Sequence, residues 1–508
     1  MTNRIRMLFK APRLEITKKT LISWLITITI FGLFLIMYFA LVFHFTGDGI
    51  FSFCPSSSDE RFYYRMINTA VNEGLFSENA GYNGSYDGSE TYTAHCLFYS
   101  TKGVFYVIPF YIVGKVVGWT TYTPLIANII FLFISVNILH FCIEKRKRTL
   151  CVLLVLLYFP MIRFIGSGML EVLVISNIVV IASVLYRYHL HPRKLTLIVL
   201  IILIALNCML RISNIVFFIP IVFILAKNKR FYYHLIYFVI AMIFSFGIKK
   251  FNGLFSAGGG GGGFLNNFYV ALNDSILSGF NLLAGHLVSN IRLYFNVFDM
   301  KSQFVFLRMS LILLLLICTF SIFFVFNSKG KIYTYKKPID QFLLSLSLVI
   351  SGSIFLVVAF YDIFDWRDYR ALSPILLFAI LSLIMRCEKY PRISCSAILI
   401  VILFLSFGFS LKDGIETHFG QETHMPISFP SNLHYNKYAI DRWDNTVLRS
   451  PKLMFTYDSG IGIITSRVDT INEKTIKTKY ILWSDKLNFD KYELVDSLTG
   501  EWYLYARD

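Results

Sequence analysis

The chain has 508 residues, of which 56% are hydrophobic, 17% aromatic and only 16% charged, with a formal net charge of +17. Because soluble domains carry about 25% charged residues, this composition excludes a soluble globular protein, a disordered chain and a small disulfide scaffold. It predicts a polytopic membrane protein. A net charge of +17 can also indicate a nucleic-acid partner, so the location of the basic residues along the chain has to decide between the two interpretations.

Residues 21–45 form the first predicted span, long enough to cross about 30 Å of hydrocarbon. The positive-inside rule places the start of the chain in the cytoplasm, because six basic residues precede this span, namely Arg4, Arg6, Lys10, Arg13, Lys18 and Lys19. The apolar run is longer than that of a cleaved signal peptide, and no small-x-small cleavage site follows it. We therefore expect residues 21–45 to remain as the first helix.

Further apolar runs predict an all-α bundle of about eleven transmembrane helices, with the N-terminus inside and the C-terminus outside. After the first span they are 124–143, 149–165, 170–186, 195–210, 213–226, 231–248, 304–326, 339–360, 371–385 and 393–411. Val104 to Gly118 is also apolar. Counting it as a span would put the basic cluster Lys145 to Arg148 outside and invert every later loop. We expect an interfacial or re-entrant helix there.

The charges separate by side in this topology. The inner segments hold 23 of the 48 Lys and Arg residues but only 4 of the 31 Asp and Glu residues, so the inside carries +19 and the outside −2. The positive-inside rule accounts for this basicity without a nucleic-acid partner. The inner loops are also too short for a cytosolic nucleotide-binding βαβ unit, which leaves the outer face for any chemistry.

Three sizeable segments face outward in this topology, namely 46–123, 249–303 and the tail 412–508. We expect a cytoplasmic segment over 1–20, a transmembrane domain over 21–411 that includes the first two outer loops, and a small α/β domain on the outer face over 412–508. Strands of that domain are predicted at 452–457, 461–468, 479–483, 492–495 and 502–506, with a hairpin turn at 497–500.

Cysteines and acidic residues give weaker signals. Cys54 and Cys96 flank the first outer loop and can form a disulfide if the compartment is oxidising. Asp362, Asp365 and Asp368 can attract a divalent cation, but Arg367 and Arg370 are interleaved with them, so ion pairing is the favoured interpretation. No zinc-type spacing occurs, and no cofactor is predicted, although a divalent cation remains open.

Charged side chains gather near the predicted outer ends of the spans. They are Arg163, Glu171, Arg211, Lys249, Lys250, Arg308, Arg367 and Arg370, with Asp59, Glu60 and His95 in the first outer loop. Because a charge in the centre of a span costs about 3 kcal/mol, this distribution favours an outer-leaflet cavity in which arginines hold an anionic headgroup opposite a carboxylate. Each residue alone can instead be a snorkelling anchor. Asp59-Glu60 can equally be an ordinary helix start capped by Ser58.

The order of these features resembles the GT-C class of integral-membrane glycosyltransferases, which use polyprenyl-phosphate sugars as donors. The resemblance rests on Ser58 to Tyr64 after the first helix, on the Val104 to Gly118 segment, and on Gly168-Met169-Leu170-Glu171, Met209-Leu210-Arg211 and Asp368 to Pro374 at helix ends, within residues 20–411. Within the class the chain is similar to bacterial and phage-borne enzymes that modify lipopolysaccharide O-antigen, including serotype-converting glucosyltransferases. The stretch Phe105 to Pro109 departs from the Pro-Pro-Leu-like segment that this family often shows before its interfacial helix.

The resemblance implies a hexosyltransferase in the bacterial inner membrane, with its site facing the periplasm. It implies that Asp59 or Glu60 is the catalytic base, whereas the outer-end cations predict donor-phosphate contacts for Arg211, Arg370, Lys249 and Lys250. The remaining predicted substrate contacts are His95, Arg163, Glu171, Arg367 and Tyr369. The expected partners are a polyprenyl-phosphate-linked sugar, a glycan acceptor and membrane lipid.

Two other classes remain open. A lipid-linked oligosaccharide flippase or other transporter would show inverted repeats and broken helices with polar groups near the midplane, and no internal repeat is found. An O-antigen polymerase or ligase would share the lipid-linked substrate but would place its main loop late in the chain. The transferred sugar, the acceptor and the linkage are not encoded in any recognisable motif.

Overall fold

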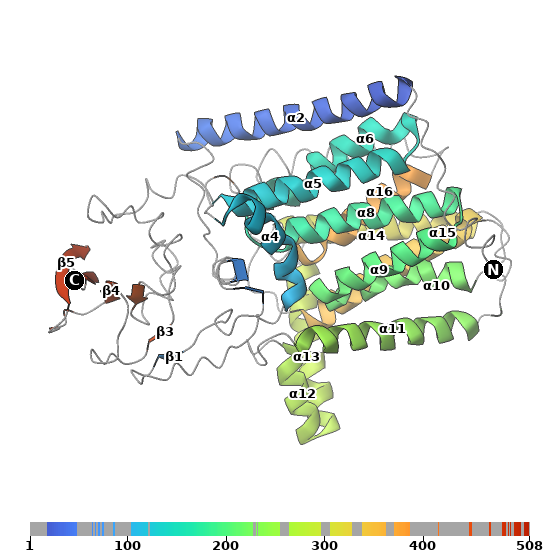
Figure 1. Ribbon diagram of the computed structural model, residues 1–508. Coiled ribbons are helices and arrows are strands. Elements are labelled where there is room, and N and C mark those ends of the chain that lie inside the picture. The colour runs from blue at the N-terminus through green and yellow to red at the C-terminus, as the bar shows by residue number, and fades with distance from the viewer. Residues whose placement is uncertain are drawn as a thin grey trace, which may run out of the picture.

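The computed structural model describes residues 18–47, 103–119, 122–226, 232–254, 264–295, 305–327, 338–361 and 370–386, together with the short strands named below and a few single positions. Within these ranges the chain forms long apolar helices that run alongside one another, with a smaller group of strands beyond one end of the bundle (Figure 1). The prediction of a largely helical chain is confirmed for this part.

The helices follow one another closely along the sequence. They are α2 Lys18–Thr46, α4 Val104–Val117, α5 Thr123–Cys142, α6 Lys145–Leu156, α7 Phe159–Phe164, α8 Glu171–Leu190, α9 Lys194–Leu210, the 3₁₀ helix η2 Ile212–Phe218, α10 Ile219–Leu225, α11 Tyr232–Gly253, α12 Phe264–Asp274, α13 Ile276–Phe295, α14 Val305–Asn327, α15 Pro338–Phe360 and α16 Ser373–Arg386.

Length and composition make five of the described helices candidate membrane spans, and these lie in α2, α5, α8, α11 and α15. Shorter apolar helices lie in the predicted runs 195–210, 213–226, 304–326 and 371–385, and α6 and α7 lie in the run 149–165. The run 393–411 lies outside the described residues, so the number eleven remains a prediction. Val104–Val117 is helical, as expected, although its interfacial position is likewise not tested.

Two of the predicted runs are interrupted rather than continuous. The run 149–165 starts earlier, at Lys145, and breaks between α6 and α7, where Pro160 occupies the first turn of the second helix. The run 213–226 begins as the 3₁₀ helix η2 and continues as α10, with Pro220 in its first turn. Proline is tolerated at a helix start because the amide hydrogen that it lacks has no partner within the helix there.

Helix α8 lies at the centre of the bundle. Its side chains Val172, Ile175 and Val179 are fully buried, and α8 packs against α5, α9 and α16. Helices α2 and α11 lie at the periphery and expose long apolar side chains such as Ile36 and Ile243. Apolar side chains on the outside of the bundle are what a helix facing lipid requires.

The turn between α7 and α8 is fixed by long-range hydrogen bonds. The buried amide of Asn128, in α5, donates from Nδ2 to the carbonyl oxygens of Ile165 at 3.0 Å and Ser167 at 2.6 Å. The hydroxyl of Tyr106, in α4, donates to the carbonyl oxygen of Gly168. These bonds satisfy carbonyl groups that the end of α7 leaves open, and they position the first residue of α8, Glu171.

The described strands form one sheet in the order β1-β3-β2-β4-β6-β5. Their bounds are β1 Ser85–Tyr86, β2 Val447–Arg449, β3 Arg467–Val468, β4 Tyr480–Trp483, β5 Glu493–Leu498 and β6 Trp502–Ala506. The parallel pairs are β1–β3, β3–β2 and β2–β4, whereas β4–β6 and β5–β6 are antiparallel, with a register shift in β5 between Leu494 and Asp496.

The tail strands agree in part with the sequence. Strands β4 and β6 match the predictions, β5 extends further than expected, and β3 is the end of the predicted 461–468 strand. Two strands were not predicted, β2 and the short β1, which comes from the first outer loop. The predicted strand 452–457 lies outside the described residues. The α/β nature and the boundaries of the tail domain remain predictions.

We predict that Asn128→Leu lowers the stability of the protein by about 1–3 kcal/mol, because it leaves buried carbonyl groups without their donor. The measurement is thermal unfolding of the purified protein in detergent. The control is Asn177→Leu, which removes a single bond to the Leu203 carbonyl oxygen and should cost less. Equal melting temperatures for the two variants would contradict the role of Asn128 at this turn.

Candidate functional site

Three charged residues at the ends of three helices meet at one point. Glu171 is the first residue of α8, Arg211 directly follows α9, and Arg370 lies three residues before α16. An acidic side chain is favourable in the first turn of a helix, where the backbone amides carry partial positive charge. Arg211 has extended backbone dihedrals, with its amide still bonded to the carbonyl oxygen of Asn207 at 3.0 Å. Its side chain therefore leaves the helix end and reaches Glu171.

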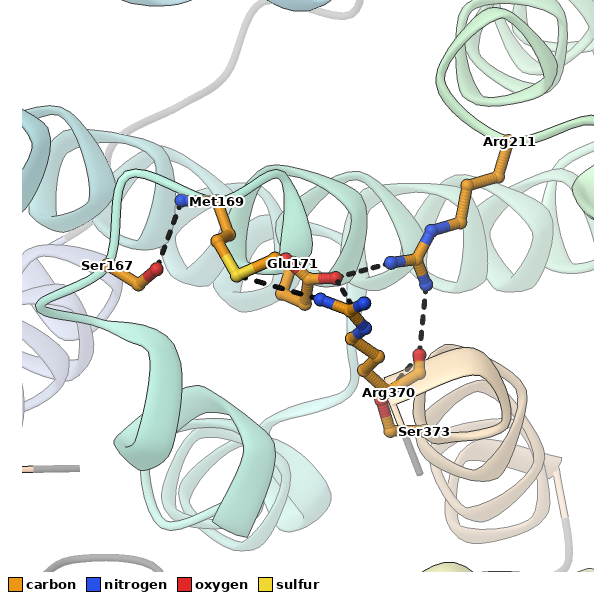
Figure 2. A network of polar contacts seen from close by, with 6 residues as sticks. All are labelled: Ser167, Met169, Glu171, Arg211, Arg370 and Ser373. Atoms are coloured by element: carbon orange, nitrogen blue, oxygen red, sulfur yellow. Dashed lines mark hydrogen bonds and ion pairs between the residues drawn. The ribbon is translucent and has the colours of Figure 1, made fainter. Parts of the chain in front are cut away.

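Glu171 lies between the two guanidinium groups (Figure 2). Its side chain is 2% exposed, against 12% for Arg211 and 19% for Arg370. Arg211 Nη2 donates to Glu171 Oε1, and Arg370 Nε lies 3.9 Å from the same oxygen. We call these three residues the Glu171 cluster. A buried carboxylate requires compensating positive charge. The burial of Glu171 therefore depends mainly on Arg211, which donates a hydrogen bond to it, and to a lesser extent on the more distant Arg370.

The backbone at Arg370 is part of the same network. Its carbonyl oxygen accepts a hydrogen bond from Arg211 Nη1 at 3.0 Å and one from the Ser373 hydroxyl at 3.2 Å. The Tyr158 hydroxyl donates to the Ser373 carbonyl oxygen at 2.7 Å. These contacts hold the start of α16 against Arg211, at the end of α9, and against Tyr158, directly before α7.

The Arg370 side chain also faces the turn before α8. Its Nη1 atom lies 3.7 Å from the sulfur of Met169, and the Met169 amide donates to the Ser167 hydroxyl at 3.1 Å. The turn that carries Met169 is the one held by Asn128 and Tyr106. The position of Arg370 is therefore linked to helices α4 and α5 as well as to α8.

The chemistry available at the cluster follows from its charges. Two guanidiniums and one carboxylate give the three residues a formal charge of +1. Glu171 Oε2 is buried and has no hydrogen-bond partner among the described residues, so it can accept a hydrogen bond from a ligand hydroxyl. Guanidinium groups bind phosphate and carboxylate oxygens with paired donors. The arrangement suits a ligand that carries both an anionic group and hydroxyl groups.

Helix α11 brings the predicted lysines to the same end of the bundle. Asn252, the penultimate residue of α11, donates from Nδ2 to the carbonyl oxygen of Met209 at 3.2 Å, and Met209 lies two residues before Arg211. Lys249 and Lys250 lie in the last turns of α11, and Lys250 is exposed. The structure does not describe the Lys249 side chain, and among the described residues Lys250 forms no ion pair with Glu171.

Two other predicted arginines are buried at separate positions. Arg163 lies in α7, 2% exposed, with its guanidinium carbon 5.4 Å from the centroid of the Phe164 ring. Arg308, near the start of α14, donates from Nε to the carbonyl oxygen of Leu293 at 3.2 Å. Arg308 thus binds the last turn of α13.

Several predicted site residues lie outside the described part of the chain. They are Asp59, Glu60, His95, Arg367, Tyr369, the Asp362, Asp365 and Asp368 cluster, and the Cys54 and Cys96 pair. Their assignments remain predictions. Within the described residues, Cys142, Cys151, Cys208 and Cys318 form no disulfide, and no group of three or more His, Cys, Asp or Glu side chains is placed to hold a metal ion.

The sequence singled out the charged members of the cluster but missed the residues that support it. Tyr106, Asn128 and Tyr158 donate to backbone carbonyls 36 to 215 residues away. Tyr106 and Asn128 lie in apolar helices and Tyr158 lies between α6 and α7. A tyrosine or asparagine in an apolar run indicates packing between helices as readily as site support. No signal in the sequence distinguishes the two.

Comparisons with known proteins give a limited result. No protein-family model and no curated protein sequence matches the chain. Among solved structures, it is similar to ArnT from Cupriavidus metallidurans bound to undecaprenyl phosphate, with a TM-score of 0.48 and 8% identity over 94% of this chain and 97% of that one. The apo state of ArnT gives a TM-score of 0.41 and 11% identity, with the same coverage. A likeness at this level assigns neither family nor activity to the chain.

We predict that Glu171→Leu destabilises the protein by up to about 3–5 kcal/mol, because it leaves the Arg211 charge in a mostly buried site without its carboxylate. The double variant Glu171→Leu/Arg211→Leu should regain part of this loss, since the stranded charge is removed with its partner. Thermal unfolding in detergent of both variants and of Arg211→Leu forms the double-mutant cycle. Additive changes would show that the ion pair does not stabilise the fold.

Proposed function

We propose that this protein is a membrane glycosyltransferase of the GT-C type, which transfers a hexose from a polyprenyl-phosphate donor to a lipopolysaccharide O-antigen or a related surface glycan. The proposed site faces the periplasm of a bacterial inner membrane. The observation that carries the proposal is the Glu171 cluster, in which two guanidiniums and a buried carboxylate meet at one end of an apolar helix bundle.

The donor is assigned from the position of the cluster. A polyprenyl phosphate has a long apolar chain that belongs in the bilayer and a phosphate that belongs at its surface, so it requires cations at the end of apolar helices. Arg211 and Arg370 meet this requirement, with Lys249 and Lys250 in the last turns of the neighbouring α11. A cytosolic nucleotide sugar fits less well, because the predicted inner segments are too short for a nucleotide-binding domain.

In the proposed reaction, Asp59 or Glu60 removes the proton from an acceptor sugar hydroxyl, a general-base contribution of about 10²–10⁴ in rate. The hydroxyl oxygen attacks the anomeric carbon, and the bond from that carbon to the phosphate oxygen breaks. Polyprenyl phosphate leaves with the electron pair. Arg211 and Arg370 stabilise the charge that develops on the leaving phosphate, while Glu171 Oε2 accepts a hydrogen bond from a sugar hydroxyl.

The test is mass spectrometry of surface polysaccharide from cells that carry the wild-type protein, no protein, or one variant at equal membrane level. We predict a hexose increment that depends on the wild-type protein. One of the two variants, Asp59→Asn or Glu60→Gln, should abolish it, and that variant identifies the base. Arg370→Lys and Arg211→Lys should each reduce transfer by about 10²–10³, because a single ammonium cannot replace paired guanidinium donors.

The matched control is Arg308→Lys, which changes a buried arginine that contacts the end of α13 rather than the cluster, and it should retain the increment. An unchanged repeat-unit mass together with altered chain length or accumulated lipid-linked intermediate would contradict glycosyl transfer and indicate a polymerase or a flippase. Full transfer by both acidic variants would refute the assignment of the base, and full transfer by both arginine variants would leave the cluster as a structural ion pair.

A further inference from the structure

Helices α12 and α13 form a hairpin with an unusual composition. The two helices, Phe264–Asp274 and Ile276–Phe295, are separated by Ser275 alone, whose hydroxyl accepts a hydrogen bond from the Ser278 amide at 3.0 Å and so caps the second helix. Asp274 and Arg292 are the only Asp, Glu, Lys or Arg residues in Phe264–Phe295. A hairpin surrounded by water would carry many more charges.

One face of the hairpin is packed. The Phe264 ring stacks on the His286 ring, with their centroids 3.7 Å apart. A side chain at Gly279 would come within 2.4 Å of the nearest Leu272 atom, so glycine permits the two helices to approach closely. These contacts make α12 and α13 one unit.

The same unit is attached to the end of the bundle. Asn290, 3% exposed, donates from Nδ2 to the carbonyl oxygens of Val358 at 2.9 Å and Tyr361 at 3.0 Å, at the end of α15. Arg308 of α14 binds the last turn of α13. The hairpin is therefore held at a defined position against α14 and α15, at the same end of the bundle as the Glu171 cluster.

The opposite face of the hairpin is apolar and exposed. Tyr269 of α12 is 60% exposed, and Ile276, Leu277 and Phe280 of α13 are 62–71% exposed. Val288 and Ile291 extend the stripe along α13 at helical spacing. An apolar stripe of this size does not remain in water.

The direction of the hairpin indicates what covers this stripe. Figure 1 shows α12 and α13 running steeply across the direction of α11 and projecting beyond it at the end of the bundle. If α11 spans the membrane, the hairpin lies close to the membrane plane. Ile243 of α11 and Leu254, which directly follows that helix, are 68% and 65% exposed, so α11 also presents apolar side chains on the outside of the bundle.

We propose that the α12–α13 hairpin is a membrane-dipping element, which lies in the interface of the outer leaflet with its apolar stripe inserted among the lipid chains. The near absence of charge on the hairpin means that the partner is the hydrophobic part of the bilayer and that anionic headgroups are not required. This inference does not depend on the proposed glycosyl transfer.

The experiment is photocrosslinking of the full chain, reconstituted in nanodiscs that contain phosphatidylcholine with an alkyne-tagged acyl chain. Benzoylphenylalanine replaces Phe280 or, in a second variant, Tyr269. Ile36 of α2, 67% exposed, is the lipid-facing reference, and Leu494 of β5, 45% exposed, is the reference on the sheet. We predict tagged-lipid adducts at both hairpin positions comparable to those at Ile36 and at least roughly tenfold above those at Leu494.

Adducts at both hairpin positions no greater than at Leu494 would overturn the proposal. So would crosslinks from these positions to another part of the chain or to a second copy in place of lipid. The measurement repeated in Arg211→Lys separates the two proposals, because lipid adducts should persist in a variant that has lost transfer. If the adducts persist while the wild-type protein adds no hexose, the hairpin inference stands and the proposed function fails.

Discussion

The arrangement of the described bundle depends on one constraint, the cost of placing a carboxylate among apolar helices. Glu171 is buried at the start of the most central helix, and its Oε1 atom is compensated by Arg211 and Arg370. Removing such a charge from water costs several kcal/mol, and the attraction within the ion pair offsets this cost only when the geometry of the pair is held in place. The hydrogen bonds from Tyr106, Asn128 and Tyr158 to the backbone around the cluster supply that support.

The cluster also joins helices that pack on one another, because α8 contacts both α9 and α16. It brings together the start of α8, the end of α9 and the start of α16. Because α8 packs on α5, and the turn before α8 is bonded to α4 and α5, the charged site and the central packing are one connected structure. A change at the cluster is therefore expected to alter the stability of the bundle together with the proposed contact to the donor phosphate.

Much of the helical fold could be predicted from the sequence, because apolar runs long enough for a bilayer are a strong signal. The positions of Glu171, Arg211 and Arg370 near helix ends on one side followed from the same topology, and the structure brings these three together. The helix breaks before Phe159 and at Ile219 were missed, since apolar composition continues through both. The strand pairing of Ser85–Tyr86 with the tail could not be anticipated either, because a pairing of two residues over a long separation leaves no periodic pattern.

The order of the cluster residues along the chain has a consequence for biosynthesis. Glu171 and Arg211 are forty residues apart and belong to consecutive helices, whereas Arg370 follows Arg211 by 159 residues. At about 5–20 residues per second, a ribosome needs roughly 8–30 s to synthesise the intervening chain. During that interval Arg211 is the only one of the two arginines that has been synthesised, so Glu171 can gain its second guanidinium partner only when the start of α16 follows.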